Sequence, residues 1–214
     1  MCGDPNTGLQ NKIILDVGAG DGSSSVLINR GGTLVISLDH NLKMLKNGLK
    51  DKKISRGHAV LADARYLPFK DDSLDLVSSR YFMHCVTAHV RYLQEMKRIM
   101  KPEGEIQIVD LCAPVPEVRE FVEICHSKEP PPSFCCRIFT KDELLYQLTR
   151  LGIQVGKIEW FAAKKKVSGR KIKSYVQEEM MRNSAIKEHI DIRKGKRNFY
   201  VHLPVVAISG EKGT

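Results

Sequence analysis

Long apolar runs are missing from this 214-residue sequence. A helix that crosses a bilayer needs about 18 consecutive apolar residues, and no stretch of the chain approaches that length. The first twelve residues, MCGDPNTGLQNK, also lack the apolar core of a secretion signal. We therefore expect a cytoplasmic protein that does not insert into a membrane.

Cysteine pairs are missing as well. The chain has six cysteines, but no two of them have the CxxC spacing that zinc sites and dithiol redox sites use. The six are Cys2, Cys85, Cys112, Cys125, Cys135 and Cys136. We expect these thiols to be reduced and the functional site to use no metal ion.

The composition excludes an intrinsically disordered chain. Hydrophobic residues make up 42% of the sequence and charged residues 28%, which is ordinary for a folded protein. The length suits one domain with a single core and a ligand cleft. We expect residues 1–214 to form that single domain.

Positive charge is concentrated in one part of the chain. The formal net charge is +9, and residues 164–197 hold 12 Lys or Arg against 4 Asp or Glu. The rest is nearly neutral, with 22 basic and 21 acidic residues. Residues 164–197, here called the basic segment, are therefore either a solvated face or a surface that attracts phosphates.

Strand-like apolar runs alternate with segments of helical periodicity. The predicted strands are 12–17, 33–38, 58–62, 74–78, 105–109, 154–161 and 199–209, and the predicted helices include 24–29, 42–49 and 89–100. This alternation predicts an α/β fold: a doubly wound, mostly parallel, seven-stranded sheet with helices on both faces. Such sheets bind ligands at the carboxyl ends of their strands.

The alternation breaks after residue 112. Residues 113–139 contain five prolines and a short helical stretch at 117–126, so we interpret them as an insert near the cleft. In the following part, 140–214, Thr140 and Glu143 form a capping box that opens a helix ending before Gly152. Another helix is expected near 174–182.

A glycine-rich turn follows the first predicted strand. Gly18, Gly20 and Gly22 allow a ligand to approach the backbone closely where a strand passes into a helix. Asp39 ends the second predicted strand, 23 residues after Asp16, where a carboxylate can accept both hydroxyls of a ribose. The glycines and the acid together predict a ligand of the nucleotide type.

The details of this turn disfavour a dinucleotide. Ser23 stands where a dinucleotide fingerprint has its third glycine. Asp16 and Asp21 flank the turn and would repel a pyrophosphate by roughly a kcal/mol or more each. S-adenosylmethionine fits better, because it offers a ribose to Asp39 and an ammonium to the acidic turn and carries no phosphate.

Five motifs resemble class I S-adenosylmethionine-dependent methyltransferases. They are LDVGAGDG, the LD that ends at Asp39, ADA at 62–64, LPFKDDSLDLV at 67–77 and LQEMKRIMKPEGEIQIVD at 93–110. The likeness is strongest to the ubiquinone/menaquinone-biosynthesis type, the type 11 methyltransferases. It implies a Rossmann-like methyltransferase fold with an antiparallel C-terminal strand, in which residues 13–112 form the cofactor-binding core.

The resemblance also implies cofactor contacts at seven positions. They are Asp16, Gly18 and Gly20 for the methionyl part, Asp39 for the ribose, Asp63 and Ala64 for the adenine amino group, and Arg80 at the end of the fourth strand. Asp63 has an alternative interpretation as an exposed strand-end acid or a helix cap.

His84 is the candidate catalytic residue. Methyl transfer from a sulfonium is an in-line displacement that needs alignment and no metal, and a base helps only if the acceptor must lose a proton. His84 follows the fourth predicted strand, where the resembling family often has a histidine. It is either a general base or a residue that packs or hydrogen-bonds beside the cofactor.

The start of the chain departs from the family pattern. Only the short N-terminal segment 1–12 precedes the first strand, where relatives usually have a longer helical lid. We expect residues 1–11, the insert with the basic segment, or a partner chain, for instance in a homodimer, to cover the cofactor.

Three functions remain open. The leading prediction is methylation of a small-molecule acceptor, with S-adenosylhomocysteine as the product. The first alternative is an RNA (tRNA) methyltransferase that uses the basic segment, although Tyr175 is its only aromatic residue for stacking. The second is an S-adenosylmethionine-binding protein without catalysis.

Overall fold

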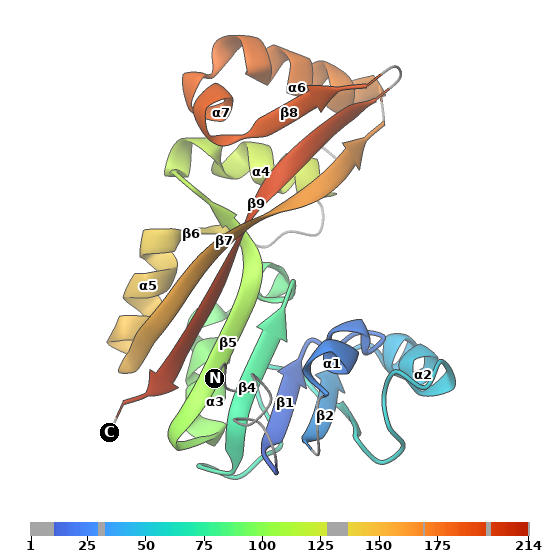
Figure 1. The fold of residues 1–214 in the computed structure, drawn as a ribbon, viewed down its shortest axis with the longest axis vertical. Helices are drawn as coiled ribbons and strands as arrows, with labels where there is room; N and C mark the ends of the chain where they lie inside the picture. The colour runs from blue at the N-terminus through green and yellow to red at the C-terminus, as the bar shows by residue number, and fades with distance from the viewer. Residues whose placement is uncertain (1–10, 30–32, 128–136, 169, 196–197, 214) are drawn as a thin grey trace, which may run out of the picture.

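The computed structural model describes residues 11–29, 33–127, 137–168, 170–195 and 198–213. A mixed sheet runs through the whole molecule, and helices cover it in the lower and the upper part (Figure 1). Parts of three predicted regions lie outside the described residues: most of the N-terminal segment, residues 128–136 of the insert, and residues 169, 196 and 197 of the basic segment.

The sheet has nine strands, of which seven form a continuous path in the order β3-β2-β1-β4-β5-β9-β7. The strands are β1 Ile13–Val17, β2 Leu34–Asp39, β3 Ala59–Leu61, β4 Leu74–Arg80, β5 Met100–Ala113, β6 Phe139–Thr140, β7 Ile153–Val167, β8 Asp191–Lys194 and β9 Phe199–Lys212. Strands β3, β2, β1, β4 and β5 are parallel, whereas β9 is antiparallel to both β5 and β7. The predicted doubly wound sheet with an antiparallel C-terminal strand is confirmed, and β6 and β8 are short additions to it.

Seven α-helices and two 3₁₀ turns connect the strands in the described residues. The helices are α1 Ser23–Ile28, α2 Leu42–Lys50, α3 His89–Ile99, α4 Arg119–Ser127, α5 Lys141–Arg150, α6 Arg170–Arg182 and α7 Ser184–His189, and the turns are η1 Met83–Cys85 and η2 Pro116–Val118. None of these helices is long and apolar enough to cross a membrane.

The main core lies between the sheet and the helices α3 and α5. Tyr92, Leu93 and Met96 of α3 recur at helical spacing and meet Leu15 of β1 in one buried cluster. Successive strand residues point to opposite faces, so Ile14 lies on the other side of the sheet, where a small cluster includes partly buried Ile28 of α1. The sheet therefore carries helices on both faces.

A second core fills the upper part of the molecule. Strands β7 and β9 continue past the end of β4, and α4, α6, α7 and β8 gather around their far halves (Figure 1). Phe121 of α4, Val176 of α6 and Ile186 of α7 are buried there with Val201 of β9. The predicted insert thus passes through α4 into this upper part. The predicted division of the chain at residues 12, 112 and 139 stays a prediction.

Several elements differ from the prediction in length. The predicted strand 105–109 is β5, which already begins at Met100, and the predicted strand 154–161 is β7, which continues to Val167. Antiparallel pairing with β9, from Val167 with Phe199 to Ile153 with Lys212, holds the whole of β7 in the sheet, including its polar residues. The added residues of β5 and β7 are held by pairing with strands far away in the sequence and show no local alternation of apolar and polar residues. The sequence pattern therefore underestimated the length of both strands.

Candidate functional site

The carboxyl ends of β1, β2, β3 and β4 meet at one edge of the sheet, and the predicted cofactor residues lie there. The turn after β1 is joined to the end of β2, because the N–H groups of Gly18 and Ala19 donate to the Leu38 carbonyl at 2.8 and 3.0 Å. The glycine turn and Asp39 are therefore direct neighbours.

The glycine turn needs glycine at its first position. Gly18 has φ 75°, in the left-handed region, and a Cβ there would overlap the ring of Phe82. Gly20 has φ 56° with open space around its Cα, apart from the end of the Met44 side chain. The turn thus combines a close approach by Phe82 at Gly18 with free space beside the half-buried Gly20.

Asp39 is almost fully buried but keeps hydrogen-bonding capacity. Its Oδ2 accepts from the N–H of Gly20 and its Oδ1 from the N–H of Asn41, each at 2.8 Å. The side chain is 9% exposed. A carboxylate oxygen accepts two hydrogen bonds, so both oxygens can still receive hydroxyl donors such as those of a ribose.

Asp16 is fully buried and incompletely satisfied. The hydroxyls of Ser24 and Ser25 donate to its Oδ2 at 2.7 and 2.6 Å, whereas Oδ1 has no hydrogen-bond partner among the described residues. Burial raises the pKa of Asp16, while the two serines and the charge of Arg80 oppose that rise. A buried, unpaired acceptor is costly, and a cationic ligand beside it would lower that cost.

A cavity of about 200 Å³ adjoins this edge. One wall is lined by His40, Asp63, Ala64 and Arg65, and the other by Phe82, Cys85, Val86 and Thr87. We call these the Asp63 wall and the Phe82 wall. The narrow space between the two walls suits a planar base.

The Asp63 carboxylate is held in place by its neighbour Arg65. The Arg65 guanidinium contacts Asp63 Oδ2 through Nη2 at 2.6 Å and through Nε at 3.0 Å. This hydrogen bonding lowers the pKa of Asp63, so the group is ionised at neutral pH. Its side chain remains 40% exposed and accessible to a donor such as an adenine amino group.

His84 lies behind the cavity, in a buried ion pair. Its Nδ1 is 2.5 Å from Oδ1 of Asp110, a residue of β5. The His84 side chain is 3% exposed. Burial alone would lower the pKa of His84, but the hydrogen bonds and charge interactions with Asp110 and Cys85 together outweigh burial and raise this pKa to about 10. A histidine that is protonated at neutral pH cannot accept a proton, so this geometry favours a positioning role for His84 over the general-base prediction.

The His84 pair ties several segments together. Asp110 also accepts from the His84 N–H at 3.3 Å and from the Leu111 N–H at 2.7 Å, and the His84 carbonyl accepts from the Arg137 N–H at 3.2 Å. The ring of His126 stands edge-on to His84 at 4.6 Å. Burial and the charge of His84 lower the pKa of His126 to about 4, which keeps its ring neutral.

Four residues of this region were not predicted from the sequence. The Phe82 ring packs against Gly18, and the Ser25 hydroxyl donates to Asp16. Arg65 forms an ion pair with Asp63, and Asp110 forms one with His84. Asp110 carried a usable signal, because it follows an apolar strand run just as Asp39 does. Ser25 and Phe82 carried none, since their roles depend on contacts between separate elements.

A larger cavity of about 640 Å³ lies between α3 and α5 and shares Thr87 with the smaller one. Its lining combines the rings of Phe139 and Tyr146 with the amides of Gln94 and Gln147. The described residues contain no group of three or more His, Cys, Asp or Glu side chains that could hold a metal ion.

Comparison with known proteins gives a family match and several relatives. A family model described as a methyltransferase domain matches residues 15–108. Demethylmenaquinone methyltransferase of Clavibacter sepedonicus is 32% identical over 146 residues, which are 66% of this chain and 58% of that protein. The mitochondrial 2-methoxy-6-polyprenyl-1,4-benzoquinol methylase of Rattus norvegicus is 44% identical over 79 residues, 35% of this chain and 24% of that protein.

The matched regions thus span 58% of the Clavibacter protein and 24% of the rat protein. Among solved structures, a candidate methyltransferase of Bacillus halodurans superposes with a TM-score of 0.81 at 18% identity, covering 97% of this chain and 95% of that one. At this identity the superposition establishes the fold alone.

Proposed function

We propose that this chain, whose residues 15–108 match the methyltransferase-domain family model, transfers a methyl group from S-adenosylmethionine to a small, quinone-like acceptor. The observation that carries the proposal is the pair of buried acids, Asp16 and Asp39, on either side of the Gly18–Gly20 turn. This pair offers carboxylate oxygens where a nucleotide-type cofactor presents an ammonium and two hydroxyls.

Each part of the cofactor has residues of matching chemistry. Asp39 accepts the ribose hydroxyls, and Asp16 with the backbone at Gly18 and Gly20 receives the methionyl part. Asp63 and Ala64 receive the adenine in the small cavity. Arg80, at the end of β4, balances the charge of Asp16 from the opposite side.

The protein's own contribution to the reaction is alignment and exclusion of water. Bound S-adenosylmethionine supplies a methyl group on a sulfonium, which a nucleophile displaces in line. The residues around the two cavities have to hold the acceptor atom in line with that methyl group, which removes much of the entropic barrier. His84 holds the Phe82 wall through its ion pair with Asp110 and moves no proton.

The acceptor proposal rests on the names of the relatives and on the larger cavity. Both relatives act on quinone-type molecules by name. The cavity that shares Thr87 offers aromatic faces and amides, which suit a planar ring with polar substituents.

Calorimetric titration tests the cofactor. S-adenosylmethionine and S-adenosylhomocysteine should bind with one site per chain, and NAD should not bind, because the buried Asp16 disfavours its pyrophosphate, whereas Asp21 is already paired with Lys53. Comparable or tighter binding of NAD would end the proposal.

Transfer of labelled methyl to a panel of reduced quinones and other planar phenols tests the reaction. Incorporation into members of the panel supports the proposed function. Tight cofactor binding without transfer to any acceptor in a broad panel would instead favour a cofactor-binding protein without catalysis. Sedimentation of the purified protein tests the predicted homodimer.

A further inference from the structure

The segment between β3 and β4 carries the Asp63 wall but has no regular secondary structure of its own. Residues 62–73 form only a few local backbone hydrogen bonds, including Tyr66 N–H to the Asp63 carbonyl and Phe69 N–H to the Leu67 carbonyl, both 2.9 Å. The other buried backbone groups of such a segment need partners elsewhere. What holds this segment therefore decides where the Asp63 wall stands.

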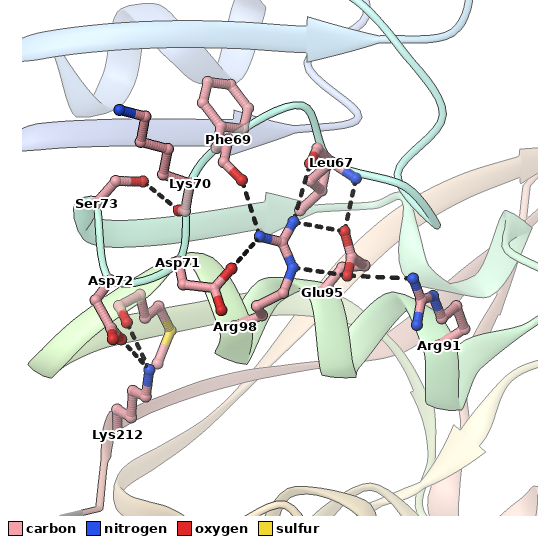
Figure 2. Close-up of polar contacts among 11 residues, drawn as sticks. Leu67, Phe69, Lys70, Asp71, Asp72, Ser73, Arg91, Glu95, Arg98 and Lys212 are labelled. Atoms are coloured by element: carbon pink, nitrogen blue, oxygen red, sulfur yellow. Dashed lines mark hydrogen bonds and ion pairs between the residues drawn. The ribbon is translucent and has the colours of Figure 1, made fainter.

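Helix α3 supplies those partners from one face. Arg91, Glu95 and Arg98 are spaced by four and three residues, which places their side chains on the same side of the helix. Figure 2 shows all three side chains pointing toward the segment. Among the described residues outside this segment, Arg98 donates the most hydrogen bonds to it.

Arg98 makes three contacts with the segment. Its Nη2 donates to the Leu67 carbonyl at 2.9 Å, and its Nη1 donates to the Phe69 carbonyl at 2.8 Å and to Asp71 Oδ1 at 2.6 Å (Figure 2). The planar fork of a guanidinium can serve these acceptors at once, which a lysine ammonium on the same stem cannot.

Glu95 fixes the direction of that fork. Its two oxygens accept from Arg98 Nε at 2.9 Å and Nη2 at 2.8 Å, and its Oε2 also accepts from the Leu67 N–H at 2.8 Å (Figure 2). The Glu95 side chain is 5% exposed. Both polar groups of the Leu67 backbone are thus bonded by the Glu95–Arg98 pair.

Arg91 extends the contact toward the cavity. Its Nε donates to the Arg65 carbonyl at 3.2 Å, and its guanidinium lies 5.4 Å from the centre of the Tyr66 ring. Arg65 belongs to the Asp63 wall. The chain of contacts from Arg98 through Glu95 to Arg91 therefore ends at Arg65, which lines the cavity.

The same helix continues at its N-terminus into the other wall. Val86 and Thr87 of the Phe82 wall lie three and two residues before His89, the first residue of α3. One rigid helix is consequently attached to both walls, by the chain at one end and by the Glu95–Arg98 pair along its side. The separation of the walls depends on both attachments.

We infer that Arg98, oriented by Glu95, is a positioning residue for the Asp63 wall and thereby controls affinity for the adenine part of the cofactor. This inference rests on the proposed function for its ligand. Arg98 itself lines neither of the two cavities. Its substitution should weaken cofactor binding while the rate at saturating cofactor stays unchanged.

A second cation provides a matched control. Lys212 of β9 holds the far end of the same segment, with its Nζ 2.5 Å from Asp72 Oδ1 and 2.8 Å from the Met100 carbonyl (Figure 2). Asp72 lies beyond the contacts of the Arg98 side chain, at the end of the segment next to β4, and its N–H donates to the Arg98 backbone carbonyl, which R98K retains. Losing this attachment should affect stability but not the Asp63 wall.

The test compares R98K with K212M. R98K keeps the charge but loses the fork, and we expect the Kd for S-adenosylhomocysteine and the KM for S-adenosylmethionine to rise about tenfold or more, with kcat within about twofold of the wild type. K212M should lower the thermal midpoint without changing the Kd by more than about twofold. Equal Kd values for R98K and the wild type, or equal losses of affinity in R98K and K212M, would overturn the inference.

A second variant and a second measurement separate this inference from the proposed function. Glu95→Gln combined with R98K should add little further loss of affinity to R98K alone, because the two side chains act as one unit. Hydrogen exchange of residues 63–69 should accelerate in R98K without any cofactor present, and unchanged exchange would refute the positioning role. If the wild type binds no S-adenosyl compound, the proposed function fails, and the exchange result alone decides whether Arg98 holds the wall.

Discussion

Three aspartates of the site differ in what surrounds their oxygens. Asp39 is bonded by backbone N–H groups, Asp16 by two serines with one oxygen unpaired, and Asp63 by a guanidinium. The sequence pointed to Asp39 by its position at the end of a predicted strand, to Asp16 by its place beside the glycine turn, and to Asp63 by the family resemblance, and their cofactor contacts stay predictions. It could not predict their partners, since Ser25 and Asp16 meet only through the packing of α1 against the sheet.

Asp39→Ala tests the ribose contact. Loss of hydrogen bonds to a charged acceptor should weaken S-adenosylhomocysteine binding by about 1.5 to 3 kcal/mol, measured by calorimetry. Asp51→Ala, at the exposed C-terminal end of α2, is the control and should bind normally. Unchanged affinity of Asp39→Ala would mean that the ribose is held elsewhere.

His84 gives a prediction for the pH dependence of stability. In the folded protein its pKa is raised to about 10 from an ordinary 6.5, so the folded state keeps a proton that the unfolded state loses in this interval. The stabilisation is complete below about pH 6.5 and is lost as the pH rises toward 10. Urea unfolding at several pH values should therefore show a falling free energy of unfolding across this window.

Asp110→Asn should remove that slope, because the charge that keeps His84 protonated is gone. His189→Asn, at an exposed position of α7, is the control and should retain it. A wild-type slope in Asp110→Asn would show that the pair does not hold the proton.

The same pair separates the two roles considered for His84. His84→Ala leaves Asp110 buried without its charged partner, which should cost about 3 to 5 kcal/mol of stability. A stable, cofactor-binding His84→Ala protein with turnover lowered by about a hundredfold or more would instead restore the general-base prediction.

At the scale of elements, local signals predicted well and long-range pairing did not. The capping box of α5 is present as predicted, with Glu143 N–H donating to Thr140 Oγ1 at 3.2 Å and Thr140 N–H donating to Glu143 Oε2 at 2.9 Å. Short β6, β8 and α7 were missed, because their few residues form regular structure only against β5, β9 and the upper core. Sequence periodicity has too little length in such elements to register.

The α5 cap makes a prediction about stability. Thr140→Ala removes the acceptor for the first turn and should cost about 1 kcal/mol, or roughly 2 to 4 °C in the thermal midpoint. Lys141→Ala, one residue further on, is the control and should change the midpoint by less than a degree or so. Equal midpoints for Thr140→Ala and the wild type would show that the cap contributes nothing.

At the scale of the whole molecule, the positive charge of the basic segment is the feature that separates the small-molecule proposal from the RNA alternative. Part of the basic segment borders a cavity of about 330 Å³ in the upper part, whose lining includes Arg170, Lys173 and Lys194. The sequence located this charge correctly. The sequence could not predict that α6 and the end of β8 bring these basic side chains to one cavity, because their proximity depends on the long pairing of β9 with β7 and β8.

Charge reversal on this surface distinguishes the small-molecule proposal from the RNA alternative. On the small-molecule proposal, Arg170→Glu combined with Lys194→Glu leaves cofactor affinity and methylation of the small acceptor unchanged, and tRNA binding is weak and nonspecific. Filter binding at two salt concentrations, with labelled methyl transfer to total RNA, measures this. Saturable, salt-sensitive binding coupled to methylation of RNA, both abolished by the reversal, would overturn the proposed acceptor.

The position of β9 has a consequence for how the chain matures on the ribosome. Strand β9 lies between β5 and the edge strand β7, so this side of the sheet cannot be completed until residues 199–212 are synthesised. Until then β5 and β7 expose unpaired edges that invite intermolecular pairing. Nascent chains stalled before Phe199 should therefore be cut by protease within 153–194 and recruit chaperones, whereas chains released beyond Lys212 should resist digestion.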